Sequence, residues 1–325
     1  MTLDGVAWSI KDAIHDVEVL QTLPYVLGGA KEGVAGHADL RVTATPVNDG
    51  NVHVAAGAAN LLNRYDGGIA LGYTIRNDAD EAVAIDPQGA GSTRYDLVAV
   101  IIEDPMFPGQ PDPADPETGP FVFFRVYENV ADATTLAEVD PAQTGYAIAK
   151  ITMPASTATV SQAQIEDLRE LVNPRVFSVT RQCEYTTGAA FVMPTAQGLF
   201  PTDAAWDVDI PEWANRVRLE ALWPSVSMLD SSGGGTGAGS GSVVAGLGSI
   251  ECDAPWASAG MVAGKAQPQC LAVAGEAEIP TGLRGTTQIL SAEAVQSVVT
   301  NLTARLVQNS SVIVKATFFE VAGAN

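Results

Sequence analysis

The sequence predicts a mainly β protein with two domains. Residues 1–175 are expected to form a β-rich module with short capped helices, and residues 176–325 a jelly-roll-like antiparallel β-sandwich. Three observations lead to this prediction. Short apolar runs of strand length recur along the chain, and they are separated by turns drawn from 31 glycines and 19 prolines. A chain of 325 residues, 46% of them hydrophobic, is also long enough to bury two cores.

A helix is expected first, over residues 9–20. Ser9 would cap its N-terminus, and Asp12 would lie in the first turn, where the helix dipole favours an anion. Apolar residues recur at helical spacing at Ile10, Ile14, Val17 and Leu20. The alternation of Val17 and Val19 leaves a strand open as a second interpretation, and the glycines from Gly28 onward end the pattern.

A period of two begins near residue 39 and indicates strands. An Asp-Gly turn at residues 46–50 predicts a hairpin with a returning strand over 51–57. The run 95–103 is almost continuously apolar, as in a strand buried on both faces. Further strands are expected at 69–76, 82–85, 121–127 and 146–153.

Two segments interrupt these strands. Residues 104–120 carry six prolines, whose missing N–H groups exclude a helix or an interior strand. Residues 161–172 are predicted to be a helix, because Ser161 and Gln164 form a capping-box pattern and Val160 and Ile165 are placed for a hydrophobic staple. Asn173-Pro174 would end this helix at the domain boundary.

The second half again shows alternation, typical of an antiparallel sandwich. The glycine- and serine-rich residues 231–241 are expected to form a flexible tip or linker between strands. Strands are predicted at 206–210, 217–223, 269–275, 286–291, 295–306 and 311–321.

The charge of the chain excludes several classes of partner. The net charge is −21 and no segment is basic, which argues against nucleic acid and against anionic membranes. The N-terminus shows no secretory signal, and no run is long and apolar enough for a membrane span, so we expect synthesis in the cytoplasm without membrane insertion. Three cysteines make no disulfide framework, although a Cys252–Cys270 pair stays open.

Several short motifs resemble the N-terminal module of tail-tip and baseplate proteins of long-tailed bacteriophages. They occur in the same order as in that module, over about the first 175 residues, at Gly5–Ser9, Val26–Gly29, Ala55–Gly57, Arg94–Val100 and Ile165–Arg169. The second half resembles the β-sandwich of tail-tip and receptor-binding proteins at Ile210–Arg218, Leu283–Gly285 and Phe318–Glu320.

This resemblance implies a structural subunit of a virion tail tip that adheres to the host surface. It also implies a homo-oligomer, most simply a trimer, with other tail-tip proteins and host cell-wall polysaccharide as further partners. The excess of Arg over Lys suggests an actinobacterial host. A capsid decoration or head-fibre protein, and a carbohydrate-binding protein or enzyme, are the alternatives. Residues 1–175 would attach to the virion, and residues 176–325 would project outward.

No catalytic, cofactor or metal pattern stands out in the sequence, so we expect no enzyme activity. His15, His37 and His53 lack zinc-ligand spacing, and the carboxylates of residues 104–117 do not match a calcium loop. Arg94 and Asp96 lie two apart on one strand face, as a structural ion pair would. Trp206 and Trp223 are expected in the core, since they alternate with polar residues.

Two tryptophans are the candidate contact residues for a receptor or glycan. Trp213 and Trp256 each follow closely after a proline, in segments that read as turns, and are therefore expected to be exposed. Exposed aromatic side chains commonly anchor a sugar or protein partner.

Overall fold

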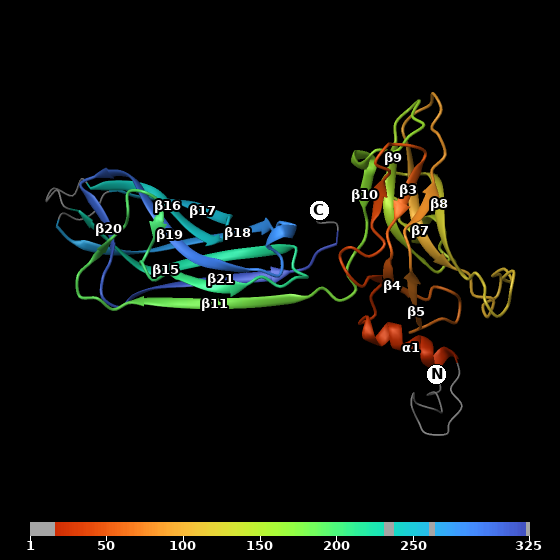
Figure 1. Cartoon of the computed structure of the whole chain (residues 1–325), viewed down its shortest axis with the longest axis horizontal. Coiled ribbons are helices and arrows are strands. Elements are labelled where there is room, and N and C mark those ends of the chain that lie inside the picture. Colours follow the sequence, from red (N-terminus) through yellow and green to blue (C-terminus); the bar gives the residue numbers. More distant parts are fainter. Residues whose placement is uncertain (1–16, 231–236, 260–263, 323–325) are drawn as a thin grey trace, which may run out of the picture. The chain divides into compact units, whose positions relative to one another are not determined.

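The computed structural model describes residues 17–230, 237–259 and 264–322 (Figure 1). It confirms the predicted mainly β fold. The chain divides into two compact units: unit 1 runs to Pro174 and takes up the chain again from Val321, while unit 2 comprises Arg175–Glu320. No helix in the described ranges has the length and apolarity that a membrane crossing requires.

The described residues of unit 1 form three antiparallel sheets. The largest has the order β10 (Ile165–Asp167), β9 (Gly145–Met153), β7 (Arg94–Ile102) and β8 (Val122–Val130). The second has the order β1 (Gly33–Val34), β4 (Gly57–Leu62) and β5 (Gly72–Asn77), and the third β2 (Val42–Ala44), β3 (Asn51–Val54) and β6 (Glu81–Ala84).

Strand β7 is buried on both faces, which explains its unbroken apolar sequence. On one face Val98 and Val100 join the main core of unit 1. On the other face Ala99 and Ile101 pack against Leu136 of the short helix α2 (Leu136–Val139). The predicted hairpin at residues 46–50 is confirmed, with Val42 opposite Val54.

The prediction of a helix over residues 161–172 is wrong. The capping box forms, with the Ser161 N–H donating to Gln164 Oε1 at 2.7 Å, but it closes only a 3-10 turn over Gln162–Gln164. The Gln164 side chain then donates to the Thr152 carbonyl at 3.1 Å, and Ile165 continues as β10 opposite Ile151. Pairing with the edge of β9 therefore replaces the helical turns that the apolar spacing suggested.

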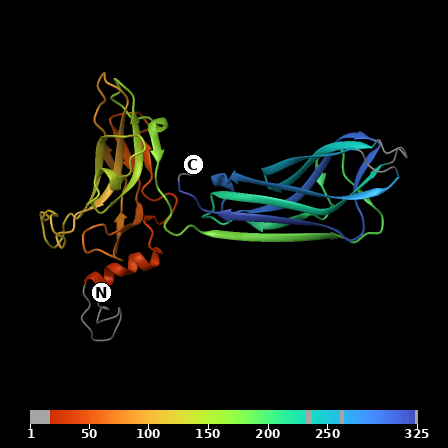
Figure 2. The same ribbon diagram turned by 180° about the vertical axis from the view of Figure 1, so that it is seen from behind.

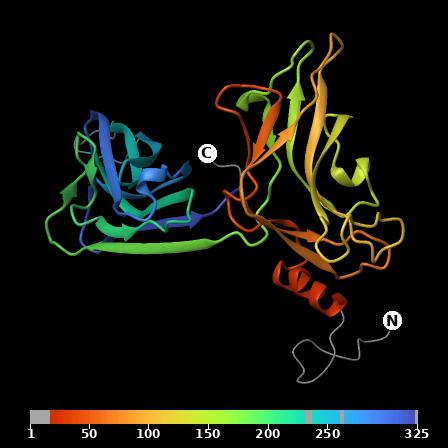
Figure 3. The same cartoon turned by 45° about the vertical axis from the view of Figure 1, so that its right-hand side comes forward.

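Helix α1 (Val17–Leu27) lies further along the chain than the sequence predicted. Residues 9–16 of the predicted helix lie outside the described part of the chain. The helix ends in a Schellman motif: Ala30 N–H donates to the Tyr25 carbonyl at 2.8 Å, and Gly29 adopts φ +62°, a conformation that favours glycine. Figure 3 shows α1 lying across the end of the β4–β5 hairpin.

Unit 2 is an eight-stranded jelly roll, which bears out the predicted fold of the second half. One sheet has the order β11-β21-β15-β18 and the other β14-β19-β16-β17 (Figures 1 and 2). In chain order each of these strands lies in the other sheet from the one before it, except that β16 and β17 form a hairpin within one sheet, which is the connectivity of a jelly roll. Their bounds are β11 Val176–Tyr185, β14 Ala205–Asp209, β15 Arg216–Asp230, β16 Ala238–Leu247, β17 Ile250–Ala259, β18 Ala266–Glu278, β19 Thr287–Thr300 and β21 Ser310–Phe319.

Shorter elements complete unit 2: β12 (Phe191–Val192), β13 (Gly198–Leu199), β20 (Leu302–Leu306) and a 3-10 turn at Thr281–Leu283. A single core fills the space between the two sheets. At its centre Trp223 is fully buried and donates its indole N–H to the Phe200 carbonyl at 2.6 Å. Alternate residues of β21, from Val312 to Phe318, point into the same core.

Two predictions for the second half need correction. The expected separate strands at 286–291 and 295–306 are divided differently, because β19 continues to Thr300 and turns at Asn301, where φ is +58°. Residues 238–241 of the glycine-rich segment are the start of β16 rather than a linker, while residues 231–236 lie outside the described part. Small residues suit β16 here, since a Cβ at Gly241 would lie 1.9 Å from the Val295 carbonyl oxygen.

Candidate functional site

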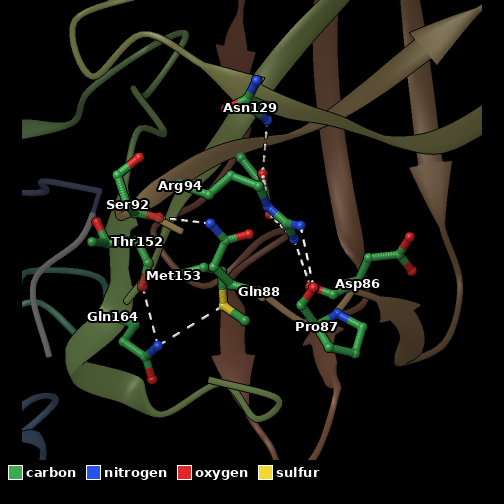
Figure 4. Close-up of polar contacts among 10 residues, drawn as sticks. Asp86, Pro87, Gln88, Ser92, Arg94, Asn129, Thr152, Met153 and Gln164 are labelled. Atoms are coloured by element: carbon green, nitrogen blue, oxygen red, sulfur yellow. Dashed lines mark hydrogen bonds and ion pairs between the residues drawn. The ribbon is translucent and has the colours of Figure 1, made fainter. Parts of the chain in front are cut away.

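Arg94 and Asp96 form a buried ion pair in unit 1. Figure 4 shows the Arg94 side chain directed toward the backbone of Asp86 and Pro87. The guanidinium donates to the Asp96 carboxylate from Nε at 2.9 Å and from Nη2 at 2.8 Å. It also donates to the backbone carbonyl of Asp86 at 2.5 Å, and Asp96 accepts the Asn129 N–H at 3.0 Å. Hydrogen bonding to Asp96 raises the pKa of Arg94, so its guanidinium stays charged. Through these hydrogen bonds the ion pair holds the loop before β7, at Asp86, and the end of β8, at Asn129, against β7.

Arg169 and Asp167 form a second pair with the same spacing and the reverse order. Arg169 is 5% exposed and donates to the Asp167 carboxylate from Nε at 2.9 Å. Its Nη1 donates to the carbonyls of His37 and Asp39 at 3.0 and 2.6 Å. Both pairs use one arginine to satisfy a carboxylate and a nearby loop together. They are structural clamps, as expected for Arg94 and Asp96.

A pocket of about 540 Å³ in unit 1 is lined in part by Glu166 and Leu168, the two neighbours of Asp167 in the chain. Glu32 and Arg64 form an ion pair on its wall, and Arg64 Nη1 donates to the Gly145 carbonyl at 3.0 Å. The lining also includes Lys150, which bonds Asp132 at 2.8 Å and Glu166 at 2.6 Å. The pocket lining thus carries charges of both signs.

Burial raises the pKa of two groups that line this pocket, Glu32 and Tyr146. It raises the pKa of Glu32 above its ordinary value, against the lowering effect of Arg64. Burial also raises the pKa of Tyr146 to about 12. Within the described residues, Glu32 Oε2 is inaccessible and has no hydrogen-bond partner. This pocket is the most chemically distinctive feature of unit 1, and sequence reasoning missed it because its residues come from five separate segments.

The two candidate contact tryptophans do not lie in one site. Trp256 is in strand β17, is 7% exposed and belongs to the core of unit 2, so the expectation that it stands exposed in a turn is wrong. Its partner across the sheet is Gly241, whose missing side chain leaves room for the indole. Trp213 is half-buried against the core, with the Arg175 guanidinium 5.2 Å from its ring centroid. The expectation of core packing holds fully for Trp223 and partly for Trp206.

Other candidate ligand residues are dispersed. His53 contacts Asp80, while His37 lies elsewhere and His15 falls outside the described part. Asp115 accepts the Glu117 N–H at 2.9 Å and the Thr118 hydroxyl at 2.7 Å, which is a local turn. Among the described residues no three His, Cys, Asp or Glu side chains gather as metal ligands would. Cys183, Cys252 and Cys270 are free thiols.

Comparison with known proteins yields only distant structural likenesses. No protein-family model matches the chain, and no curated protein matches it. The subviral particle of infectious bursal disease virus VP2 is similar at 10% identity, covering 90% of this chain and 73% of that one, with a TM-score of 0.23. A promiscuous carbohydrate-binding module of the β-sandwich superfamily is similar at 8% identity over 86% and 97% of the chains, with a TM-score of 0.15. Scores this low carry no conclusion about function.

Proposed function

We propose that this protein is a structural subunit of a phage tail tip or baseplate. Unit 1 attaches to the virion, and the jelly roll of unit 2 is presented for host-surface adhesion or tail-tip assembly, without catalysis. The proposal includes a homo-oligomer, most simply a trimer, with neighbouring tail-tip proteins and host cell-wall polysaccharide as partners. One support for the proposal is the set of sequence motifs in the first 175 residues. The other is the fold of unit 2, because jelly rolls recur in viral structural domains and in lectins.

The observation that carries the proposal is the polarity of unit 2. The chain enters at Arg175 and leaves at Glu320, and the entering strand β11 pairs with the leaving strand β21, with Val176 opposite Phe319. Arg175 closes this end by donating to the buried Glu320 carboxylate from Nε at 2.8 Å and from Nη2 at 3.0 Å.

The opposite end of unit 2 carries no chain connection to unit 1. Strand β15 starts beside the closed end, where Arg216 pairs with Phe319, and runs to Asp230, immediately before the glycine-rich segment. Its 15 residues span roughly 50 Å at ~3.3 Å per residue. A sandwich that has both of its chain connections at one end suits a projecting adhesive domain, because the loops at its other end can be presented to a partner.

Cryo-electron microscopy of virions decorated with Fab fragments tests both location and polarity. A Fab raised against unit 2 is expected to add density at the end of the tail. A matched Fab against unit 1 should bind the free protein but find its epitope covered on virions. Decoration of the capsid would favour the head-fibre alternative, and undecorated virions would overturn a structural role.

A further inference from the structure

Strand β8 lies at the edge of the largest sheet of unit 1. Among the described strands it pairs only with β7, and Figure 1 shows it at the margin of the sheet. From Val122 to Val126 it contains no proline, keeps an unbroken register with β7 and carries one charged residue, Arg125. Edge strands are usually protected by prolines, bulges, charges or a covering segment, because their free backbone groups recruit further strands. This stretch of β8 has little of that protection.

The hydrogen bonds of β8 show which of its backbone groups face away from β7. The Glu103 N–H donates to the Phe121 carbonyl at 2.9 Å, so the backbone of Phe121 faces β7. Backbone groups point alternately to the two sides along an antiparallel strand. The N–H and C=O groups of Val122 and Phe124 therefore point away from the sheet, where an added strand would bond to them.

A groove lies beside this free edge, between β8 and β5. It consists of two adjoining hollows of about 260 and 350 Å³, and Ile75 and Val122 line both of them. Tyr73 lines the first and Phe124 the second, and both side chains pack against the main core of unit 1. The residues of an added strand opposite Val122 and Phe124 would share their face of the sheet. Their side chains would therefore enter an apolar groove.

The charges around the groove favour a basic partner. Glu103 and Asp104 line the first hollow, and Arg76 and Glu81 line the second. Arg125 offsets the charge of Glu103, at a distance of 2.6 Å. The chain as a whole carries a net charge of −21, which attracts cationic segments and repels acidic ones. A second copy of this chain carries the same net charge and is disfavoured at this groove.

We propose that an extended, basic segment of another virion protein adds as a strand to the free edge of β8. Apolar side chains at alternate positions enter the groove between β8 and β5, and lysine or arginine side chains occupy the positions between them. Backbone hydrogen bonds hold such a segment, while the groove selects its alternate side chains. This inference rests on the proposed attachment of unit 1 to the virion, and it names the attaching surface.

The test uses the full chain and a short synthetic peptide in which valine and lysine alternate. Fluorescence anisotropy measures the dissociation constant, and hydrogen–deuterium exchange locates the bound peptide. In the free protein the Val122 and Phe124 amides should exchange faster than those of β7, since they face away from the ladder. Binding of the peptide should slow their exchange.

Two N-methylated peptides separate strand addition from attraction between charges. Valines that enter the groove also direct their N–H groups to β8, so N-methylation of the valines removes the donors to β8. N-methylation of the lysines leaves those donors in place and is the matched control, with the same charge and the same number of methyl groups. We expect the valine-methylated peptide to bind at least about tenfold more weakly than the control at the same ionic strength.

A pair of protein variants tests the same edge from the other side. Val122→Pro removes an N–H that faces away from β7, a position where an edge strand tolerates proline. Val192→Pro is the matched control, because Val192 is 52% exposed on β12, an edge strand of unit 2. We expect Val122→Pro to weaken binding of the unmodified peptide by about tenfold and Val192→Pro to leave it unchanged.

Four results would overturn the inference. The first is equal affinity for the two methylated peptides, which would show binding by charge alone. The second is unchanged affinity of the Val122→Pro variant, and the third is an absence of binding, or protection that lies elsewhere in the chain. The fourth is slow exchange at Val122 and Phe124 in the free protein, which would show that the edge is already covered. The location of the protein on the virion is tested separately by Fab decoration.

Discussion

Units 1 and 2 are both antiparallel β structures, yet different interactions hold them together. In unit 1 the buried charged side chains Arg94, Asp96 and Arg169 bind loops and strand ends. In unit 2 one apolar core runs from Val179 to Phe318 between two sheets. Strand length also differs: β15 has 15 residues and alternates inward and outward as far as Trp223, whereas in unit 1 β7 has nine residues, β1 two and β2 three.

Short strands leave many backbone carbonyls in loops, and buried carbonyls need donors. A guanidinium supplies five N–H groups in one fixed plane, enough for a carboxylate and a loop at once. In long strands the backbone carbonyls accept hydrogen bonds from neighbouring strands. The inward side chains are therefore not needed as donors and can be apolar. The comparison therefore predicts that unit 1 is sensitive to the loss of charge and unit 2 to the loss of volume.

The largest effect is expected from Trp223→Ala in unit 2. The substitution removes a fully buried indole and leaves the Phe200 carbonyl without its donor, at a cost of about 4 kcal/mol. Differential scanning calorimetry should show the transition of unit 2 lowered and that of unit 1 unchanged. Trp206→Ala, at a half-buried site, is the matched control and should cost less. If both variants lowered the unfolding free energy of unit 2 equally, the core would not be centred on Trp223.

The next effect is expected from Asp96→Asn in unit 1. Neutralising this fully buried carboxylate leaves Arg94 charged and only partly satisfied, at a cost of about 3 kcal/mol in the unfolding of unit 1. Glu220→Gln in unit 2 is the control, because Glu220 is 34% exposed and meets Lys315 at 3.6 Å. That substitution should change stability by less than about 1 kcal/mol. Similar changes in unfolding free energy for the two variants would mean that the Arg94–Asp96 ion pair contributes no more to stability than a surface ion pair.

Sequence reasoning succeeded where one periodicity governs a segment. The apolar run of β7, the hairpin at residues 46–50 and the inward position of Trp223 all follow from patterns within a few residues. The Arg94–Asp96 pair was also predictable, because side chains two residues apart share a strand face.

It failed where a distant segment decides the local structure. Residues 161–172 carry helical spacing and a capping box, yet β9 offers an unpaired edge that recruits Ile165–Asp167 as a strand. Trp256 reads as a turn residue after Pro255, yet β16 pairs along the whole segment and Gly241 makes room for the ring. The pocket around Glu32 depends on segments that no local pattern relates.

The smallest effect is expected from Glu32→Gln in unit 1. It should change the stability of unit 1 in a pH-dependent way and leave unit 2 unchanged. Burial raises the folded-state pKa of Glu32 above the ordinary value of 4.5, so folding disfavours the charged carboxylate. This cost is absent below pH 4.5 and grows as the pH rises through the folded-state pKa. Glu32→Gln removes the ionisation, and the variant should therefore gain stability relative to the wild type between pH 4.5 and pH 7.

Glu138→Gln is the matched control within unit 1, and it should shift in the opposite sense. Glu138 accepts the Thr135 N–H at 2.8 Å, which lowers its pKa, so its stabilising contribution is present at neutral pH and is lost in acid. Melting temperatures of unit 1 at the two pH values, with ionic strength fixed, give the sign for each variant. The transition of unit 2 should be the same in both variants and in the wild type. If the Glu32→Gln variant has the same melting temperature of unit 1 as the wild type at both pH values, water or an ordered donor solvates the Glu32 carboxylate. Burial would then not disfavour its charged form.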